Sequence, residues 1–238
     1  MIVRTLILAR FLRLAGLNLG NFGLKSRRKN LAKIVAQDKK HKFAPAEFLA
    51  NFAVHNFTKM IEFRKVENSA DLLFGKAYEL YENTFPAVER RSFESLKQVL
   101  DHNKAFEMSA LMIDGDFAGF FDFWRFDGFV FGEHFAVDPK MRGKNIGSEV
   151  IKCLCAKVNL PVVLEVEHPE DEMSARRIAF YERLGFRVLP QTYEQPYYDG
   201  SRTMLPLLLM SSDYDFACTN FDKIVKVVHK EVYDYVEN

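Results

Sequence analysis

The sequence predicts a mixed α/β (α+β) domain over residues 60–238, in which a central sheet of about seven strands is flanked by helices. Three observations predict it. Short strand-like runs alternate with segments whose apolar residues recur at helical spacing. Asp-Gly pairs mark tight turns between strand-like runs. A basic, glycine-bearing bend separates a strand pattern from a helix pattern in "FGEHFAVDPKMRGKNIGSEVI".

The domain is predicted to begin with one strand and two helices. Residues 61–66 alternate as a strand, and Ser69 is a candidate N-cap for the helix that follows. Pro86 ends that helix, and Ser92 is the candidate cap of a second one. Each helix has an apolar face, which is formed by Ala70, Leu73, Ala77, Leu80 and Tyr81 in the first and by Phe93, Leu96, Val99 and Leu100 in the second.

Three consecutive strands are predicted next. "FEMSALMID" and "FAGFFDFWRF" form a hairpin through Asp114-Gly115, and Asp127-Gly128 leads into "FVFGEHFAV". Twenty-three phenylalanines in the chain suit such a β-rich core.

The second half alternates helices and strands. Helical spacing follows the bend at Ile146, Val150, Ile151, Leu154 and Val158. "PVVLEVE" (161–167) is a short apolar strand, and "MSARRIAFYERLGF" is a helix closed by Gly185. Two strands near 186–193 and 203–210 precede a last amphipathic helix, whose apolar face is Phe221, Ile224, Val225, Val228 and Val232.

Residues 1–59 differ from the domain in charge. They hold 12 lysines and arginines against Asp38 and Glu47, a net of +10, whereas residues 60–238 hold 21 basic and 30 acidic side chains, a net of −9. No uncharged apolar run reaches the length of a membrane span. The segment is interpreted as an upstream translation, with the true start at Met60. The alternatives are a membrane-surface helix, an organelle transit peptide or a nucleic-acid-binding arm through "KSRRKN".

Composition narrows the class of protein further. Cys153, Cys155 and Cys218 form no metal-like spacing, and such a sparse, odd count favours reduced thiols in a cytoplasmic protein. The six histidines do not cluster, so no protein-built metal site is predicted. Nucleic acid is not an expected partner of the domain, and a homodimer is left open.

The glycine-bearing bend has the character of a phosphate-binding turn. Successive backbone N–H groups at a helix N-terminus can bind a pyrophosphate, and Arg142 and Lys144 add positive charge. Ser148-Glu149 after Gly147 excludes a P-loop, which requires Lys at that place. Gly143 and Gly147 are spaced GxxxG and therefore also fail the dinucleotide fingerprint GxGxxG.

"VDPKMRGKNIGSEVI" followed by "FYERLGF" resembles the GNAT acetyltransferase superfamily over about residues 60–212. That family carries [RQ]xxGx[GA] after its fourth strand and a tyrosine-bearing helix that ends in GF after its fifth. Arg142 to Gly147 match the first motif, with Asn145 in place of its first glycine, and Tyr181 and Gly185-Phe186 match the second. The resemblance implies the acyl-CoA N-acyltransferase fold.

The resemblance also implies acetyl-CoA as the acyl donor. Its pantetheine arm would bond backbone groups near a kink in the fourth strand, at Phe135, Ala136 and Val137. Its pyrophosphate would rest on the amides of Arg142, Gly143, Lys144, Asn145, Ile146, Gly147 and Ser148. Ser174 and Arg177 depart from the family's usual Asn and Ala, and the implied backbone contacts to CoA do not depend on these two side chains.

Two residues are the catalytic candidates. Glu133 would take the proton of the acceptor amine, because its aromatic neighbours could raise the pKa of its carboxyl group; the alternative is a hydrogen-bonded strand residue. Tyr181 would protonate the departing thiolate, as the resemblance implies; its alternative is core packing. His134 is interpreted as structural. Further candidates near the acceptor are Glu165, Glu167, His168, Tyr197, Tyr198 and the loop of Glu89, Arg90 and Arg91, for which a solvated loop is the preferred interpretation. Arg176 and Arg177 either reach CoA phosphates or solvate their helix.

The predicted function is transfer of acetyl from acetyl-CoA to the primary amine of a small molecule, and the net charge of −9 favours a cationic acceptor. Three alternatives are kept: a protein or peptide N-acetyltransferase, a non-catalytic acyl-CoA-binding regulatory module, and a nucleic-acid-binding protein acting through residues 1–59.

Overall fold

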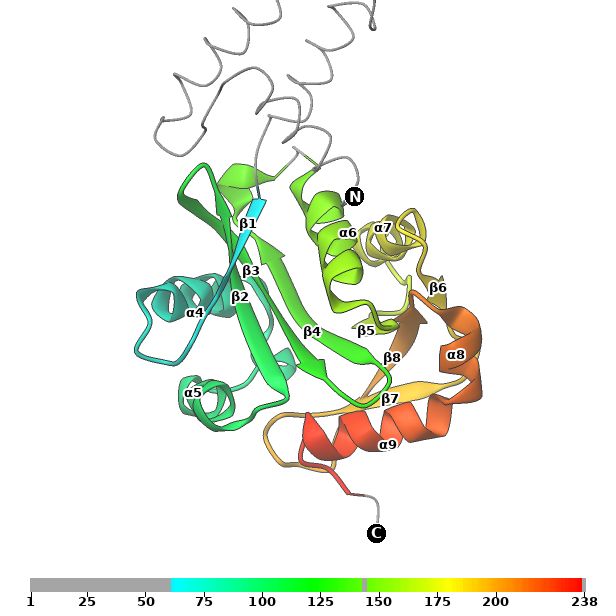
Figure 1. The fold of residues 1–238 in the computed structure, drawn as a ribbon. Coiled ribbons are helices and arrows are strands. Elements are labelled where there is room, and N and C mark those ends of the chain that lie inside the picture. The colour runs from blue at the N-terminus through cyan, green and yellow to red at the C-terminus, as the bar shows by residue number, and fades with distance from the viewer. Residues whose placement is uncertain (1–60, 143–144, 237–238) are drawn as a thin grey trace, which may run out of the picture. The chain divides into compact units, whose positions relative to one another are not determined.

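The computed structural model describes residues 61–142 and 145–236 (Figure 1). The expectations for residues 1–59, and those for Gly143 and Lys144 within the bend, lie outside the described residues.

One twisted sheet runs through the centre of the domain. Its first four strands lie side by side in chain order and are antiparallel: β1 (Ile61–Lys65), β2 (Phe106–Ile113), β3 (Asp116–Arg125) and β4 (Val130–Val137). β5 (Val162–Val166) joins β4 in parallel, and β8 (Met204–Ser211) is antiparallel to β5. Two short strands, β6 (Arg187–Val188) and β7 (Tyr193–Pro196), pair with β8. The sheet has eight strands. About seven were expected, and the difference arises because residues 186–196 form two short strands in place of one.

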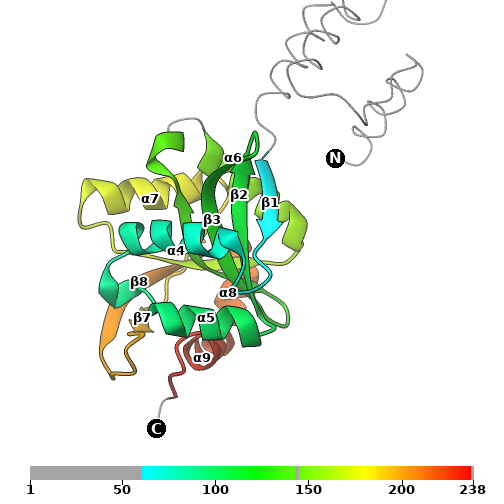
Figure 2. The same cartoon turned by 90° about the vertical axis from the view of Figure 1, so that its left-hand side faces the viewer.

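Helices cover both faces of the sheet (Figures 1 and 2). One face carries α4 (Leu72–Thr84), α5 (Phe93–His102) and α9 (Phe221–Glu231), whose apolar residues join one large buried cluster with the sheet. The other face carries α6 (Ile146–Val158) and α7 (Glu172–Glu182), which pack on two further clusters. The predicted mixed α/β architecture is confirmed.

Two local predictions differ from the structure. The first helix begins at Leu72 and is capped by Asp71, whose side chain accepts from the Leu73 amide. Ser69 instead donates its hydroxyl to Asp101, at 2.6 Å. A short helix, α8 (Tyr214–Thr219), precedes α9 and was not predicted. The Ser92 cap is confirmed, because its hydroxyl accepts from the Ser95 amide at 3.2 Å.

Strands β4 and β5 are paired over only part of their length. Pairing in register joins Val130–Gly132 of β4 to Val162–Leu164 of β5, and it ends at Gly132. The edge of β4 from Glu133 onward is therefore not occupied by β5. In an α/β sheet, such a separation of neighbouring parallel strands is a common place for a ligand.

Two features of the pairing between β3 and β4 shape this part of β4. Asp122 pairs with His134 but Phe123 pairs with Gly132, so Glu133 is an extra, bulged residue. Further along, Gly119 has φ +155°, and a Cβ there would lie 2.2 Å from the carbonyl oxygen of Ala136. The close approach of β3 to β4 at Ala136 thus requires a residue without a side chain.

Candidate active site

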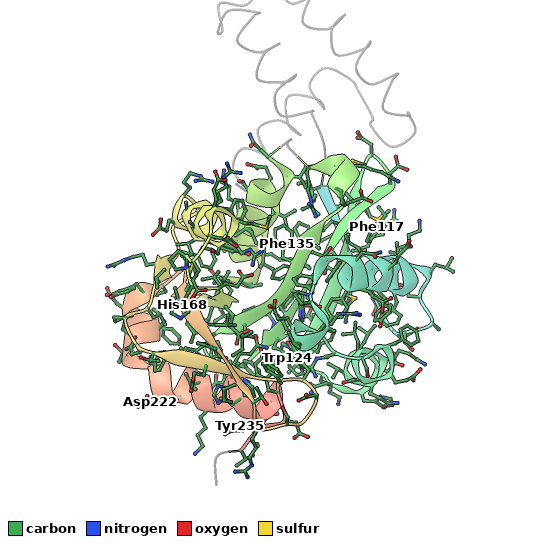
Figure 3. All side chains as sticks on the ribbon, turned by 180° about the vertical axis from the view of Figure 1, so that it is seen from behind. Phe117, Trp124, Phe135, His168, Asp222 and Tyr235 are labelled. Carbon is green, nitrogen blue, oxygen red and sulfur yellow. The ribbon has the colours of Figure 1, made fainter. Side chains whose placement is uncertain are left out.

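A cavity of about 430 Å³ opens beside the separated ends of β4 and β5. It is bordered by the α4–α5 loop, β4, β5, α7 and the β7–β8 hairpin. Figure 3 labels Phe135, which borders the cavity from β4, and Trp124, which lies on the neighbouring strand β3. The polar residues around the cavity are Thr84, Glu89, Glu133, His134, Glu165, Glu167, Arg176, Arg177, Tyr181, Gln195 and Tyr198.

The bulge at Glu133 decides which side chains meet at this wall. Regular alternation would place Glu133 and His134 on opposite faces of β4. Because Glu133 is an extra residue, both Glu133 and His134 border the cavity. The kink that the resemblance implied for the fourth strand is thus present, one or two residues before Phe135.

Glu133 is held by three hydrogen-bond donors, one of which, Arg91, is also a cation. Its Oε1 accepts from Arg91 at 3.1 Å and from the Tyr198 hydroxyl at 2.8 Å, and its Oε2 accepts from the Trp124 indole at 2.6 Å. Burial opposes ionisation, but the charge of Arg91, with that of His134 and these hydrogen bonds, holds the pKa of Glu133 below its ordinary value. The expectation of a raised pKa is therefore wrong.

The part of Glu133 that reaches the cavity is its main chain. Its side chain is 1% exposed, whereas the residue as a whole is only half-buried. The carboxylate thus lies behind the wall, where it fixes the positions of Arg91, Trp124 and Tyr198.

Arg91 does not belong to a solvated loop. Its side chain is 8% exposed and lies over the rings of Trp124 and Tyr198, 5.5 and 4.8 Å from their centroids. It also donates to the carbonyl of Val232, the residue that follows the last turn of α9. Sequence spacing could not reveal this role, because its partners lie far away along the chain.

His134 forms a second buried pair, with Asp122. The His134 Nδ1 lies 3.4 Å from Asp122 Oδ1, and the imidazole Nε2 lies 3.1 Å from the Glu89 carbonyl. Burial lowers the pKa of His134, but the charge of Asp122 more than offsets burial and helps to raise the pKa to about 9. A charged His134 is consistent with the structural interpretation of this residue.

Glu165, on β5, has a different environment. Its two oxygens accept hydrogen bonds from the hydroxyls of Tyr193 and Tyr233, the latter at 2.7 Å. Burial raises the pKa of Glu165 to about 7, and the two tyrosine hydrogen bonds partly oppose the rise. Glu165 was only a secondary candidate in the sequence.

Tyr181 borders the same cavity from α7. Its ring packs against Phe180 and Phe186, and its carbonyl accepts from the amides of Leu184 and Phe186, which close the helix. Burial raises the pKa of Tyr181 to about 12, so its hydroxyl is protonated at neutral pH.

The helix after the glycine-bearing bend begins without a side-chain cap. Asn145, its N-cap, is left-handed at φ 57° and its side chain bonds none of the first amides of α6. Ile146 is buried, Gly147 and Ser148 are half-buried, and exposed Arg142 bonds the Val137 carbonyl at 3.1 Å. A Cβ on Gly147 would meet Phe180 at 3.4 Å and Phe135 at 3.6 Å. The uncapped first turn of α6 therefore presents backbone donors beside the cavity wall.

The two departures on α7 have structural explanations. Ser174 forms a capping box with Asp171, whose side chain accepts from the Ser174 amide at 2.7 Å. Arg177 is paired with Glu167, and Arg176 with Glu172. Met173, at the start of the helix, is 70% exposed at the cavity edge.

One group of side chains has the spacing of metal ligands: ligand atoms of Asp122, Glu133 and His134 lie within 4.8 Å of one another. The Arg91 guanidinium, 3.1 Å from Glu133, already supplies a cation there. This donor set therefore does not fit an added metal ion.

The comparisons with known proteins agree with one another. The profile of the family "Acetyltransferase (GNAT) domain" matches residues 107–188. A solved GNAT-family protein from Bacteroides thetaiotaomicron, assigned as an acetyltransferase, is 34% identical over 74% of this chain and 100% of its own, with a TM-score of 0.70. No curated protein matches the chain.

Two other solved structures are less similar. Spermidine N-acetyltransferase from Vibrio cholerae, solved with CoA and spermine, is 16% identical over 63% of this chain and 94% of its own (TM-score 0.47). The ribosomal-protein-S18-alanine N-acetyltransferase from Escherichia coli is 20% identical over 64% and 92% (TM-score 0.47). Among the helices that the structure describes, none has the length and apolar character needed to cross a membrane.

Proposed function

The chain belongs to the GNAT acetyltransferase family, and from that premise we propose that it transfers the acetyl group of acetyl-CoA directly to the primary amine of a small molecule. It has the acyl-CoA N-acyltransferase fold and is an acetyltransferase. The observation that carries the proposal is the cavity between β4, β5 and α7, which adjoins the uncapped N-terminus of α6.

The residues proposed to hold the acyl donor include the end of β4 and the first turn of α6. The main chain of Phe135, Ala136 and Val137 would hold the pantetheine arm, because β5 leaves this edge of β4 unpaired. The amides from Arg142 to Ser148 would hold the pyrophosphate at the start of α6, since that turn has no side-chain cap. When bound, acetyl-CoA supplies the acetyl group as an activated thioester.

The acceptor is proposed to enter the cavity from the side of the α4–α5 loop. A volume of about 430 Å³ is within the range of small-molecule sites, about 300–1,000 Å³. The net charge of −9 over residues 60–238 would attract an alkylammonium ion. Together these properties favour a small cationic amine over an extended peptide.

Proton transfer completes the reaction. An alkylammonium must lose a proton before its nitrogen can attack, and the departing thiolate must gain one. Tyr181 is proposed as the acid, because its hydroxyl is protonated and borders the cavity. Glu133 remains the sequence-derived proposal for the base. As a base it would be weak, since Arg91 stabilises its charge.

The test is thiol release from acetyl-CoA with a panel of small amines and peptides. We expect turnover with small amines, and a loss of about 10²-fold or more in kcat for Tyr181→Phe. Tyr78→Phe is the matched control, because Tyr78 packs on Phe93 and does not border the cavity. Turnover of peptides alone would select a protein acetyltransferase. CoA binding without turnover of any amine would select a regulatory module.

Calorimetry tests the donor site separately. Replacing Gly147 with Trp would force a bulky side chain against Phe180 and Phe135, and we expect a large loss of CoA affinity in a folded protein. Unchanged CoA binding in this variant would remove the proposed pyrophosphate site.

A further inference from the structure

The carboxylates around the cavity divide into those with a cationic partner and those without. Glu133 is paired with Arg91, and Glu167 with Arg177. Among the described residues, Glu89 and Glu165 have no ion pair. Of these two, Glu165 is the one whose carboxylate is fixed, because both of its oxygens accept hydrogen bonds.

Glu165 also has the better position. It is the residue of β5 that directly follows Leu164, the last residue paired with β4. Glu133 holds the corresponding place on β4, directly after Gly132, so the two glutamates occupy equivalent positions where the strands separate. The open edge of β4, proposed to bind the thioester arm, begins at this point. An amine that attacks there would lie between the two strands.

We propose that Glu165 accepts the proton of the acceptor's ammonium group, and that Tyr193 and Tyr233 are positioning residues that hold its carboxylate toward the cavity. This proposal rests on the proposed function. Glu133 then acts as a fixed anion that, through Arg91 and Tyr198, keeps the cavity wall in place.

The protons and bonds balance. The ammonium gives one proton to the Glu165 carboxylate, and the neutral nitrogen attacks the thioester carbonyl. The C–N bond forms, the C–S bond breaks, and Tyr181 protonates the thiolate. The nitrogen loses its second proton to the Tyr181 phenolate, and Glu165 returns the first proton to solvent. The net products are the N-acetyl amine, CoA thiol and one proton.

The surroundings of Glu165 suit this task. Arg91 is paired with Glu133 and His134 with Asp122, so among the described residues Glu165 is a buried acid without an ion-pair partner. Burial raises its pKa to about 7, which allows it to take up and release a proton near neutral pH. Burial likewise raises the pKa of Tyr193 and Tyr233 well above the ordinary value, so both remain donors.

The test is the pH dependence of kcat/KM between pH 5.5 and 9, with an acceptor amine that stays protonated over this range. Wild type should show an acid limb that bends near pH 7. Glu165→Gln should lose about 10²–10⁴-fold in kcat/KM and lose the bend, while CoA affinity is kept. Glu133→Gln should keep a bend but move it to lower pH, because Glu165 stays in place and loses the nearby negative charge that helps to raise its pKa.

Tyr233→Phe tests whether Tyr233 positions the Glu165 carboxylate or only stabilises the fold. It removes one hydrogen bond to the ionised carboxylate, so the bend should move to higher pH. Tyr235→Phe is the matched control, since Tyr235 packs on His229 and does not contact Glu165. Carboxyl infrared titration of wild type provides a readout without turnover, in which one buried carboxyl group should titrate near pH 7.

The outcomes distinguish the two proposals. Wild type that acetylates no amine overturns both this proposal and the proposed function. Wild type that acetylates amines, together with Glu165→Gln that keeps the acid limb, overturns only the role of Glu165. Absence of a carboxyl group titrating between about pH 6 and 8 overturns it as well, even if Glu165→Gln does not fold.

Discussion

Arg91→Met is predicted to destabilise the protein by about 3–5 kcal/mol. Methionine approximates the volume of the arginine stem but removes the charge. The ionised Glu133 would then keep its two neutral donors, Trp124 and Tyr198, and lose the cation that bonds directly to it. Val232 would lose the donor to its carbonyl as well.

The magnitude follows from burial. The Arg91 and Glu133 side chains are 8% and 1% exposed, so solvent cannot replace the lost partner. Removing one member of a buried pair costs about 3–5 kcal/mol, because an uncompensated charge remains, whereas an exposed pair contributes less than about 1 kcal/mol. Arg90, paired with Glu82 at 3.0 Å, provides the comparison, since the Glu82 side chain is 52% exposed.

The assay is urea unfolding of wild type, Arg91→Met, Glu133→Gln and the double variant. Each single variant should be strongly destabilised, and the double variant should be less destabilised than the sum, with a coupling of about 2 kcal/mol or more. Arg90→Met should change stability by less than about 1 kcal/mol. Additive effects, or a loss in Arg91→Met as small as in Arg90→Met, would refute the reasoning.

Three further predictions concern stability. Glu165 holds its proton more tightly when folded, with a pKa of about 7 against 4.5, so it stabilises the fold below about pH 4.5 and this contribution is lost as the pH rises through about 7. The free energy of unfolding of wild type should therefore fall by about 3 kcal/mol relative to that of Glu165→Gln over this range, as measured by urea unfolding at each pH. The same pH dependence in both proteins would contradict this prediction. Gly119→Ala should destabilise by about 2 kcal/mol or more, since its Cβ would overlap the Ala136 carbonyl. Gly75→Ala, on the exposed face of α4, should stabilise by about 0.5–1 kcal/mol. Shifts of the melting temperature in the same direction for both variants would argue against this. Ser92→Ala should cost about 1 kcal/mol through loss of the α5 cap, and an unchanged melting temperature would show that the hydrogen bond to Ser95 contributes nothing.

The fold was predictable because its signals are local. The Asp114-Gly115 hairpin, the Ser92 cap and the apolar face of residues 146–158 each depend on a few neighbouring residues, and all three are present. The split of residues 186–196 into two strands was missed because each strand is very short. The N-cap was misplaced because Ser69 and Asp71 are both good capping residues.

The environment of the candidate site could not be read in the same way. The pairing of Arg91 with Glu133 spans 42 residues and the bond from Tyr233 to Glu165 spans 68, and no local pattern encodes either contact. The bulge at Glu133 also changes the face on which every later side chain of β4 lies, and one extra residue has no signature in an alternating aromatic strand. The predicted pKa of Glu133 was wrong for this reason: its aromatic neighbours were visible in the sequence, but Arg91 was not.

The hydrogen bond between Trp124 and Glu133 has a practical consequence. Trp124 is the single tryptophan of the chain, and its indole N–H is bonded to the carboxylate at the centre of the buried network. Tryptophan emission therefore reports the surroundings of Trp124 alone and is not an average over several sites. An emission change at constant helix content would signal that the polar cluster around Glu133 has rearranged while the surrounding helices and strands stay folded.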